Sequence, residues 1–200
     1  KIPFKHTEKL SIKRSDDFDE DCLAPQWQWN YQPRKDYFSL TERPGWLRLK
    51  AYRPLETNNL LKAGNTLTQR TFRKQNNDVT IKMDISNMQD GQKNGLCHFS
   101  SQHSAIGIVK EEDACYLEYR KNGNITKGIQ IHSEFVWFRT EWGMDGKSQY
   151  YYSLDGDNFL PFGEKYQLTW GNYRGDRIGI YCFNDKKETG SVDVDYCHYR

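Results

Sequence analysis

The most constraining feature of this sequence is an apolar side chain at every second position of residues 79–85. Valine, isoleucine and methionine occupy the odd positions, and threonine, lysine and aspartate occupy the even ones. A period of two places the apolar side chains on one face of an extended strand, so the run predicts a half-buried β-strand. Similar runs recur along the chain, at residues 46–51, 105–110, 115–120, 135–142, 149–154, 177–183 and 192–199.

Five Asn-Gly or Asp-Gly pairs lie among these runs, at residues 90–91, 94–95, 122–123, 145–146 and 155–156. Such pairs tolerate positive φ angles, so each predicts a tight turn between antiparallel strands. No segment between the runs has a convincing 3.6-residue period, which argues against a parallel sheet with crossover helices. We therefore predict an all-β fold, a sandwich of two packed antiparallel sheets.

The length and composition are those of one globular domain. Aromatic residues make up 14% of the 200 residues and glycine is frequent, whereas leucine, alanine and methionine are scarce, which favours strands and turns over helices. Residues 1–14 mix charge with little periodicity. We expect a linker or N-terminal extension there, and a single β-sandwich domain over residues 15–200.

Charge and hydropathy argue against several classes of partner. With 29 Lys and Arg against 27 Asp and Glu, the chain lacks the basic excess that neutralises a phosphate backbone, so we expect no nucleic-acid partner. No run approaches the roughly 18 apolar residues of a membrane span. The first residues are too polar for a secretory signal, so we expect an extracellular or periplasmic protein whose signal peptide lies outside this sequence.

The five cysteines are widely spaced and lack any CxxC pair. We expect them to be mostly small buried residues, with a disulfide between two of them as the alternative.

Seven short motifs follow one another in an order that is more specific than any one of them. They are DDF at residues 16–18, LAPQWQWN at 23–30, SLTERPGWLRL at 39–49, NTLTQRTF at 65–72, GIVKE at 107–111, YSLDGDNF at 152–159 and DVDY at 193–196. The ordered set resembles the C-terminal concanavalin A-like β-sandwich, a jelly roll, that follows the catalytic propeller in many enzymes of glycoside hydrolase family 43. The resemblance covers about residues 15–200.

The resemblance implies a parent glycosidase, a β-xylosidase or α-L-arabinofuranosidase acting on xylan or arabinan side chains. Its catalytic β-propeller would be this module's partner. Inverting glycoside hydrolysis ordinarily needs two carboxylates roughly 6.5–9.5 Å apart, and in this family both belong to the propeller. The chain also lacks the Glu-x-Asp-x-x-Glu strand of catalytic concanavalin A-like hydrolases, so we expect no catalytic residue here.

In related xylosidases a loop of the sandwich closes one side of the substrate pocket, and we place that loop in the NTLTQRTF block. Gln69, Arg70 and Phe72 are the candidate substrate-binding residues. Arginine offers a planar fork of donors to hydroxyl or carboxylate groups, and phenylalanine offers an apolar wall. The alternative is that Leu67 and Phe72 pack in the core while Arg70 pairs with an acidic neighbour.

Acidic residues near both ends of the chain suggest a metal site. Asp193 and Asp195 are two positions apart on an expected strand, which places their α-carbons roughly 7 Å apart on one face. Asp17 and Asp19 repeat this spacing. If the first and last strands are neighbours, carboxylates from both would supply oxygen ligands to a hard cation. We predict a structural Ca²⁺ involving Asp17 and Asp195, with solvated acids as the alternative.

The six tryptophans allow a different function, a free-standing carbohydrate-binding, lectin-like module whose exposed rings stack on a xylan or arabinan oligosaccharide. In a chain short of leucine, a tryptophan is more often a core residue. Trp137 and Trp142 are five positions apart on one expected strand, so they should lie on opposite faces and one of them should be exposed.

Overall fold

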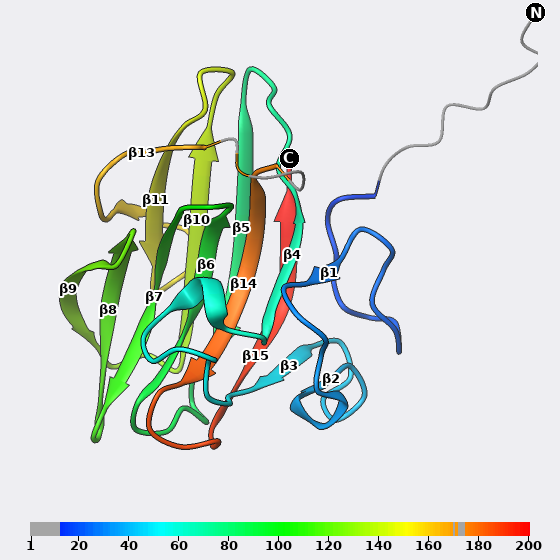
Figure 1. Ribbon diagram of the computed structural model, residues 1–200, viewed down its shortest axis with the longest axis vertical. Coiled ribbons are helices and arrows are strands. Elements are labelled where there is room, and N and C mark those ends of the chain that lie inside the picture. The colour runs from blue at the N-terminus through cyan, green and yellow to red at the C-terminus, as the bar shows by residue number, and fades with distance from the viewer. Residues whose placement is uncertain (1–12, 170, 172–174) are drawn as a thin grey trace, which may run out of the picture.

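The structure is a computed structural model that describes residues 13–169, 171 and 175–200. Over these residues it contains two antiparallel sheets packed face to face, here named the front and back sheets (Figure 1). The predicted all-β sandwich is therefore confirmed. In spatial order, the front sheet contains β1 (Gln28–Trp29), β4 (Thr66–Arg70), β14 (Arg177–Asn184), β6 (Gln92–Phe99), β7 (His103–Glu111), β8 (Ala114–Lys121) and β9 (Asn124–Ile131).

The back sheet is built around β5 and carries the last strand of the chain next to it. Its spatial order is β12 (Leu160–Pro161), β11 (Lys147–Ser153), β10 (Phe135–Trp142), β5 (Asn77–Asp84), β15 (Ser191–Tyr199), β3 (Leu47–Lys50) and β2 (Phe38–Ser39), and β13 (Tyr166–Gln167) pairs with β11. The described residues also form two short 3₁₀ helices, η1 (Lys35–Tyr37) and η2 (Leu60–Lys62).

The core lies between the sheets and follows the period-two pattern of the strands. Val79, Ile81 and Met83 of β5 are fully buried. They belong to one hydrophobic cluster with Leu96 of β6 and Ile180 of β14. Burying an aliphatic side chain of this size stabilises the folded state by roughly 1.5–3 kcal/mol. The alternation predicted for residues 79–85 is confirmed.

The outer face of the front sheet is covered by the chain itself. Leu60 of η2 is fully buried against a second apolar cluster that includes Tyr181 and Phe183. Beside it, Glu118 and Arg120 of β8 form a buried ion pair. The pair lies beneath the segment that precedes η2, because the Arg120 guanidinium also donates to the Asn58 side-chain oxygen at 2.8 Å.

The Asn-Gly and Asp-Gly pairs have three different outcomes. Those at residues 122–123, 145–146 and 155–156 join paired strands, as predicted. The pair at 90–91 lies in a connection that crosses from β5 in the back sheet to β6 in the front sheet. The prediction for Asn94 and Gly95 is wrong, because both lie inside β6. Gly95 is needed there because a Cβ would lie 2.1 Å from the Ile106 carbonyl oxygen of β7.

The first described residues run beside the last strand. Asp16 and Cys197 form an antiparallel bridge, with the Asp16 N–H donating to the Cys197 carbonyl at 2.9 Å. The Tyr199 N–H donates to the Ser15 hydroxyl at 2.9 Å. Of the expected extension over residues 1–14, only Lys13 and Arg14 fall within the described residues.

The cysteines are all free. Cys97, Cys182 and Cys197 are buried, Cys115 is half-buried and Cys22 is exposed. Burial raises the pKa of the three buried thiols, which keeps them neutral and suits a packing role.

No helix among the described residues is long and apolar enough to cross a membrane.

Candidate functional site

The candidate residues lie where the chain leaves β4 and crosses between the sheets. β4 ends at Arg70, and the chain reaches the start of β5 at Asn77. The Thr71 N–H donates to the Asp176 carbonyl at 3.3 Å, which fixes the first step of this crossing to the residue before β14. We name this end of the sandwich the upper end; β4, β10 and β15 end there and β5 and β14 begin there (Figure 1).

Phe72 is held at the upper end by hydrogen bonds to both of its backbone polar groups. Its N–H donates to the Tyr199 hydroxyl, and its carbonyl accepts from the Trp142 indole N–H, each at 2.7 Å. Both partners belong to the back sheet, are nearly fully buried, and contact each other edge to face. Burial raises the pKa of Tyr199, so its hydroxyl stays neutral. These two bonds fix the backbone of Phe72 through groups that are themselves fixed in the core.

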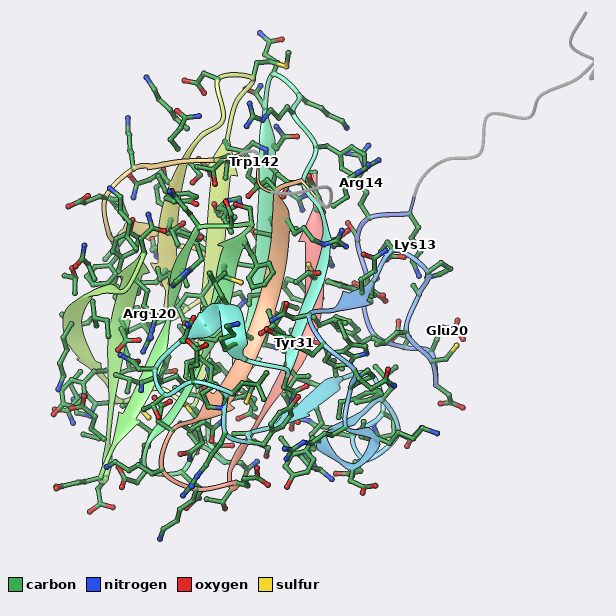
Figure 2. The ribbon with its side chains drawn as sticks, in the orientation of Figure 1. Lys13, Arg14, Glu20, Tyr31, Arg120 and Trp142 are labelled. Carbon is green, nitrogen blue, oxygen red and sulfur yellow. The ribbon has the colours of Figure 1, made fainter. Side chains whose placement is uncertain are left out.

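The Phe72 ring is half-buried and contacts the N-terminal segment. It lies 6.0 Å from the Tyr199 ring, measured between centroids. The Arg14 guanidinium carbon lies 4.8 Å from the Phe72 ring centroid and 5.6 Å from that of Tyr199. Figure 2 shows Arg14 and Trp142 at this same end of the molecule. The residues just before the sandwich are therefore attached to the candidate loop by a cation–π contact.

The structure places Gln69 and Arg70 differently. The Gln69 side chain is buried, and its Nε2 donates to the Arg14 carbonyl at 3.1 Å. Arg70 is exposed, and among the described residues its guanidinium has no hydrogen-bond or ion-pair partner. Gln69 thus supports the loop from inside, whereas Arg70 is free to meet a ligand. The alternative in which Arg70 pairs with an acidic neighbour does not occur within the described part of the chain.

Polar side chains are buried beneath the loop. His98 is fully buried, and its Nε2 lies 2.9 Å from the Thr140 hydroxyl. Its Nδ1 lies 3.6 Å from an oxygen of the Asp176 carboxylate, which makes no hydrogen bond to any residue that the structure describes. The His98 ring also meets the Trp142 ring edge to face. Asp176 links these buried side chains to the loop. Its backbone carbonyl accepts a hydrogen bond from the Thr71 N–H, and its carboxylate faces His98.

Trp142, Tyr199, Arg14 and His98 were not predicted as parts of this site. Trp142 and Tyr199 are the last residues of their strands, and both strands were expected from the alternation of apolar residues. Their meeting at Phe72 depends on which strands are neighbours and how the sheets face each other. No local sequence signal contains that information.

The acidic residues proposed as metal ligands have basic neighbours. Asp17 lies 2.7 Å from His198 Nε2, and Asp195 lies 2.7 Å from the Lys82 ammonium group. Asp193 forms ion pairs with Arg48 and Arg43. The first and last segments are neighbours, as the metal hypothesis requires. No group of three or more His, Cys, Asp or Glu side chains in the described residues is arranged to hold a metal ion. The Ca²⁺ site stays a prediction.

The tryptophans divide between core and surface. Trp142 is buried and Trp137 is half-exposed on the other face of β10, as the five-residue spacing predicts. Trp46 is also half-exposed, but the Arg43 guanidinium carbon lies 3.8 Å from its ring centroid. The Trp137 indole N–H donates to the Tyr196 hydroxyl at 3.1 Å. Neighbouring side chains therefore already contact these two rings.

Comparison with known proteins supports the interpretation of the motifs. The profile of the "Beta xylosidase C-terminal Concanavalin A-like domain" family matches residues 15–200. A β-xylosidase of Formosa agariphila is 35% identical over 94% of this chain and 35% of its own length. The chain thus spans about a third of that relative.

Solved structures agree with the fold. A protein of Bacteroides eggerthii described as a bifunctional GH43-CE has a TM-score of 0.84 at 29% identity, over 93% of this chain and 25% of that one. A GH43 protein of Bacillus licheniformis has a TM-score of 0.82 at 23% identity, over 97% of this chain and 40% of that one. At that lower identity the second likeness concerns the fold alone.

Proposed function

Because this chain belongs to the family of β-xylosidase C-terminal concanavalin A-like domains of glycoside hydrolase family 43, we propose that it serves a longer glycosidase as an accessory module. In this proposal the catalytic domain precedes residue 15, and the sandwich packs against it and forms one wall of its substrate pocket. The substrate would be an oligosaccharide of xylan, since the F. agariphila relative is named a β-xylosidase, with an arabinan oligosaccharide as the alternative that the motifs suggest.

One observation carries the pocket proposal: the backbone of Phe72 is fixed beside an exposed Arg70 that has no partner among the described residues. A pocket wall must keep its shape when substrate arrives, because mobile groups lose conformational entropy on binding. The two backbone bonds of Phe72 supply that rigidity. An arginine without a partner keeps its donors available for sugar hydroxyl groups.

The test uses the intact protein and a chromogenic aryl xyloside or arabinofuranoside. Arg70→Ala should lower kcat/KM by about tenfold if the guanidinium binds substrate, which corresponds to roughly 1.4 kcal/mol of transition-state binding. Phe72→Ala removes the ring but keeps both backbone bonds, so it tests the apolar wall without releasing the loop. Lys35→Ala is the control, since Lys35 is exposed and lies in η1, far from the upper end. Unchanged kinetics in both upper-end variants would reject the pocket assignment.

The isolated 200-residue chain distinguishes this function from the alternatives. We expect it to release no sugar from aryl glycosides and to show no affinity for xylan or arabinan in a retardation gel. Binding without hydrolysis would favour a carbohydrate-binding module. Hydrolysis by the isolated chain would place catalytic residues in the sandwich and overturn the proposal.

A structural Ca²⁺ at Asp17 and Asp195 remains a separate proposal. Binding there would require the two carboxylates to exchange His198 and Lys82 for the cation. A ligand that binds only the folded state raises its melting temperature. Adding CaCl₂ to the chelator-treated protein should then raise that temperature, and an unchanged melting curve would remove the proposal.

A further inference from the structure

The upper end carries a group of basic residues that form no ion pair with a carboxylate in the described part of the chain. Lys13, Arg70, Arg73 and Lys74 are exposed, Arg14 is half-exposed, and we name the five the basic cluster. Among the described residues none of them forms an ion pair with Asp or Glu. Arg73 donates to the Leu168 carbonyl at 3.1 Å, and Arg14 lies over two aromatic rings. Neither contact compensates a positive charge with a negative one.

The cluster is gathered by the fold. Arg70, Arg73 and Lys74 lie on or just after the end of β4, and Lys13 and Arg14 come from the N-terminal segment. The bond from Gln69 to the Arg14 carbonyl and the contact of Arg14 with Phe72 hold the two segments together. Figure 2 labels Arg14 near the upper part of β4 and Lys13 on the N-terminal segment to its right.

This local excess contrasts with the balance of the whole chain. The formal net charge is only +2, and many basic residues elsewhere pair with carboxylates. Examples are Lys50 with Glu42, Lys93 with Asp185, and Arg34 with Glu188. A surface that carries an excess of one charge favours a partner surface of the opposite sign, and that complementarity also orients the partner.

The place of the cluster identifies the partner that would meet it. The matching family consists of C-terminal domains, and this chain spans 35% of the F. agariphila relative. A domain that precedes residue 13 in a longer protein is covalently attached at the cluster itself. Such a tether gives the two surfaces a high effective concentration, so even a modest electrostatic complementarity orients them.

We propose that the basic cluster is the docking surface of this module for an acidic face of the domain that precedes it in the intact protein. This inference rests on the proposed function and adds to it the chemistry of the contact. Arg70 has two roles at the edge of that contact, pairing with the preceding domain and facing the substrate.

The first test compares two charge reversals in the intact protein. Arg70→Glu with Lys74→Glu alters two exposed side chains of the cluster that have no partner in the described structure. Lys35→Glu with Lys187→Glu is the matched control, since both residues are exposed, lie at the opposite end of the sandwich, and give the same change in net charge.

At low ionic strength the cluster variant should melt about 2–4 °C below the control. The difference in melting temperature should disappear in about 0.5 M NaCl, because salt at that concentration screens exposed charges that are more than a few ångströms apart. Equal melting of the two variants at low salt would overturn the inference. If the wild-type protein instead melts as two independent units at every salt concentration, the two domains do not pack and the proposed function fails as well.

The second test asks which residues touch. A carbodiimide joins a lysine amine to a carboxylate in direct contact, with no spacer, so it reports ion pairs. In the intact protein Lys13 or Lys74 should be recovered joined to an Asp or Glu that precedes residue 1, and Lys187 should not. Recovery of Lys13 and Lys74 joined only to carboxylates of this module, or to none, would contradict the docking surface.

Discussion

The loops at the two ends of the sandwich are held by different kinds of contact. At the lower end, where β14 passes into β15, the side chains of Lys93 and Asp185 form a largely buried ion pair, and Arg34 pairs with Glu188. At the upper end two neutral groups hold Phe72, the Tyr199 hydroxyl as an acceptor and the Trp142 indole N–H as a donor, while the nearby cations form no ion pair with a carboxylate of the described residues. The upper end thus combines a fixed backbone with positive charges that lack a partner among the described residues, and both properties suit a docking or binding surface.

The largest effect is expected from breaking the network at the lower end. Asn184 is fully buried, and its amide donates to the carbonyls of Asp90 and Thr189 while accepting from the N–H groups of Lys186 and Lys187. Asn184→Ala leaves these backbone groups without a partner and should lower the free energy of unfolding by about 3 kcal/mol. Urea denaturation measures the change. A loss no larger than that of the exposed control Asn76→Ala would show that the network contributes little.

Acid should weaken the upper end through His103. Burial, and then the charge of Arg120, lowers the pKa of His103 from 6.5 to about 4. The unfolded chain therefore takes up a proton before the folded one does, so stability falls as the pH drops from 6.5 to 4 and levels off below that. The loss approaches about 3 kcal/mol for this one group. His103→Gln should remove most of this dependence in unfolding curves measured between these pH values. His132→Gln, at an exposed position, should not.

A smaller effect is expected from releasing Phe72. Trp142→Phe removes the donor to the Phe72 carbonyl, and Tyr199→Phe removes the acceptor of the Phe72 N–H. Each substitution should lower the free energy of unfolding by about 1–2 kcal/mol, because a backbone group of Phe72 loses its partner. Hydrogen exchange at the Phe72 amide should accelerate most in Tyr199→Phe. If both variants keep wild-type protection at that amide, the loop is held by other contacts.

The smallest effects should come from the exposed charges. Arg34→Gln removes the pairing with Glu188 and should cost at most about 0.5 kcal/mol, since both side chains are well exposed. Arg70→Gln should leave the stability of the isolated module unchanged or slightly raised, because it removes a charge that nothing within the described residues compensates. Melting temperatures measured at low salt compare the stabilities of the two variants. A clear loss for Arg70→Gln would reveal a partner within the module and weaken the contrast between the ends.

The sequence predicted the strands better than their connections. Alternation located β5, β10 and β15 nearly to their ends, because the period of two is a local property of an extended chain. The turn at Asn94 failed for a non-local reason. Gly95 lies in a strand because Ile106 of the neighbouring strand approaches it closely, and an Asn-Gly pair contains no sign of that neighbour.

The substrate-binding role of Gln69, Arg70 and Phe72 stays a prediction, and the structure shows how differently their side chains lie. All three residues predicted from the NTLTQRTF block lie at the upper end, yet Gln69 points inward to the Arg14 carbonyl. Neighbouring strand residues point to opposite faces, so Gln69 and Arg70 cannot both face the same side. That alternation was available from the sequence, whereas the sheet face that is buried at this point was not.

The sequence by itself determined that this chain folds as a sandwich of antiparallel strands and, through its ordered motifs, to which family it belongs. Tertiary structure alone decided that Phe72 is held by Tyr199 and Trp142, which are 127 and 70 positions away along the chain. It also decided that, over residues 13–169, 171 and 175–200, the cations near Arg70 form no ion pair with a carboxylate. The physical reason is that burial patterns depend on near neighbours in sequence. Hydrogen bonds and ion pairs between distant residues exist only once the two sheets have packed.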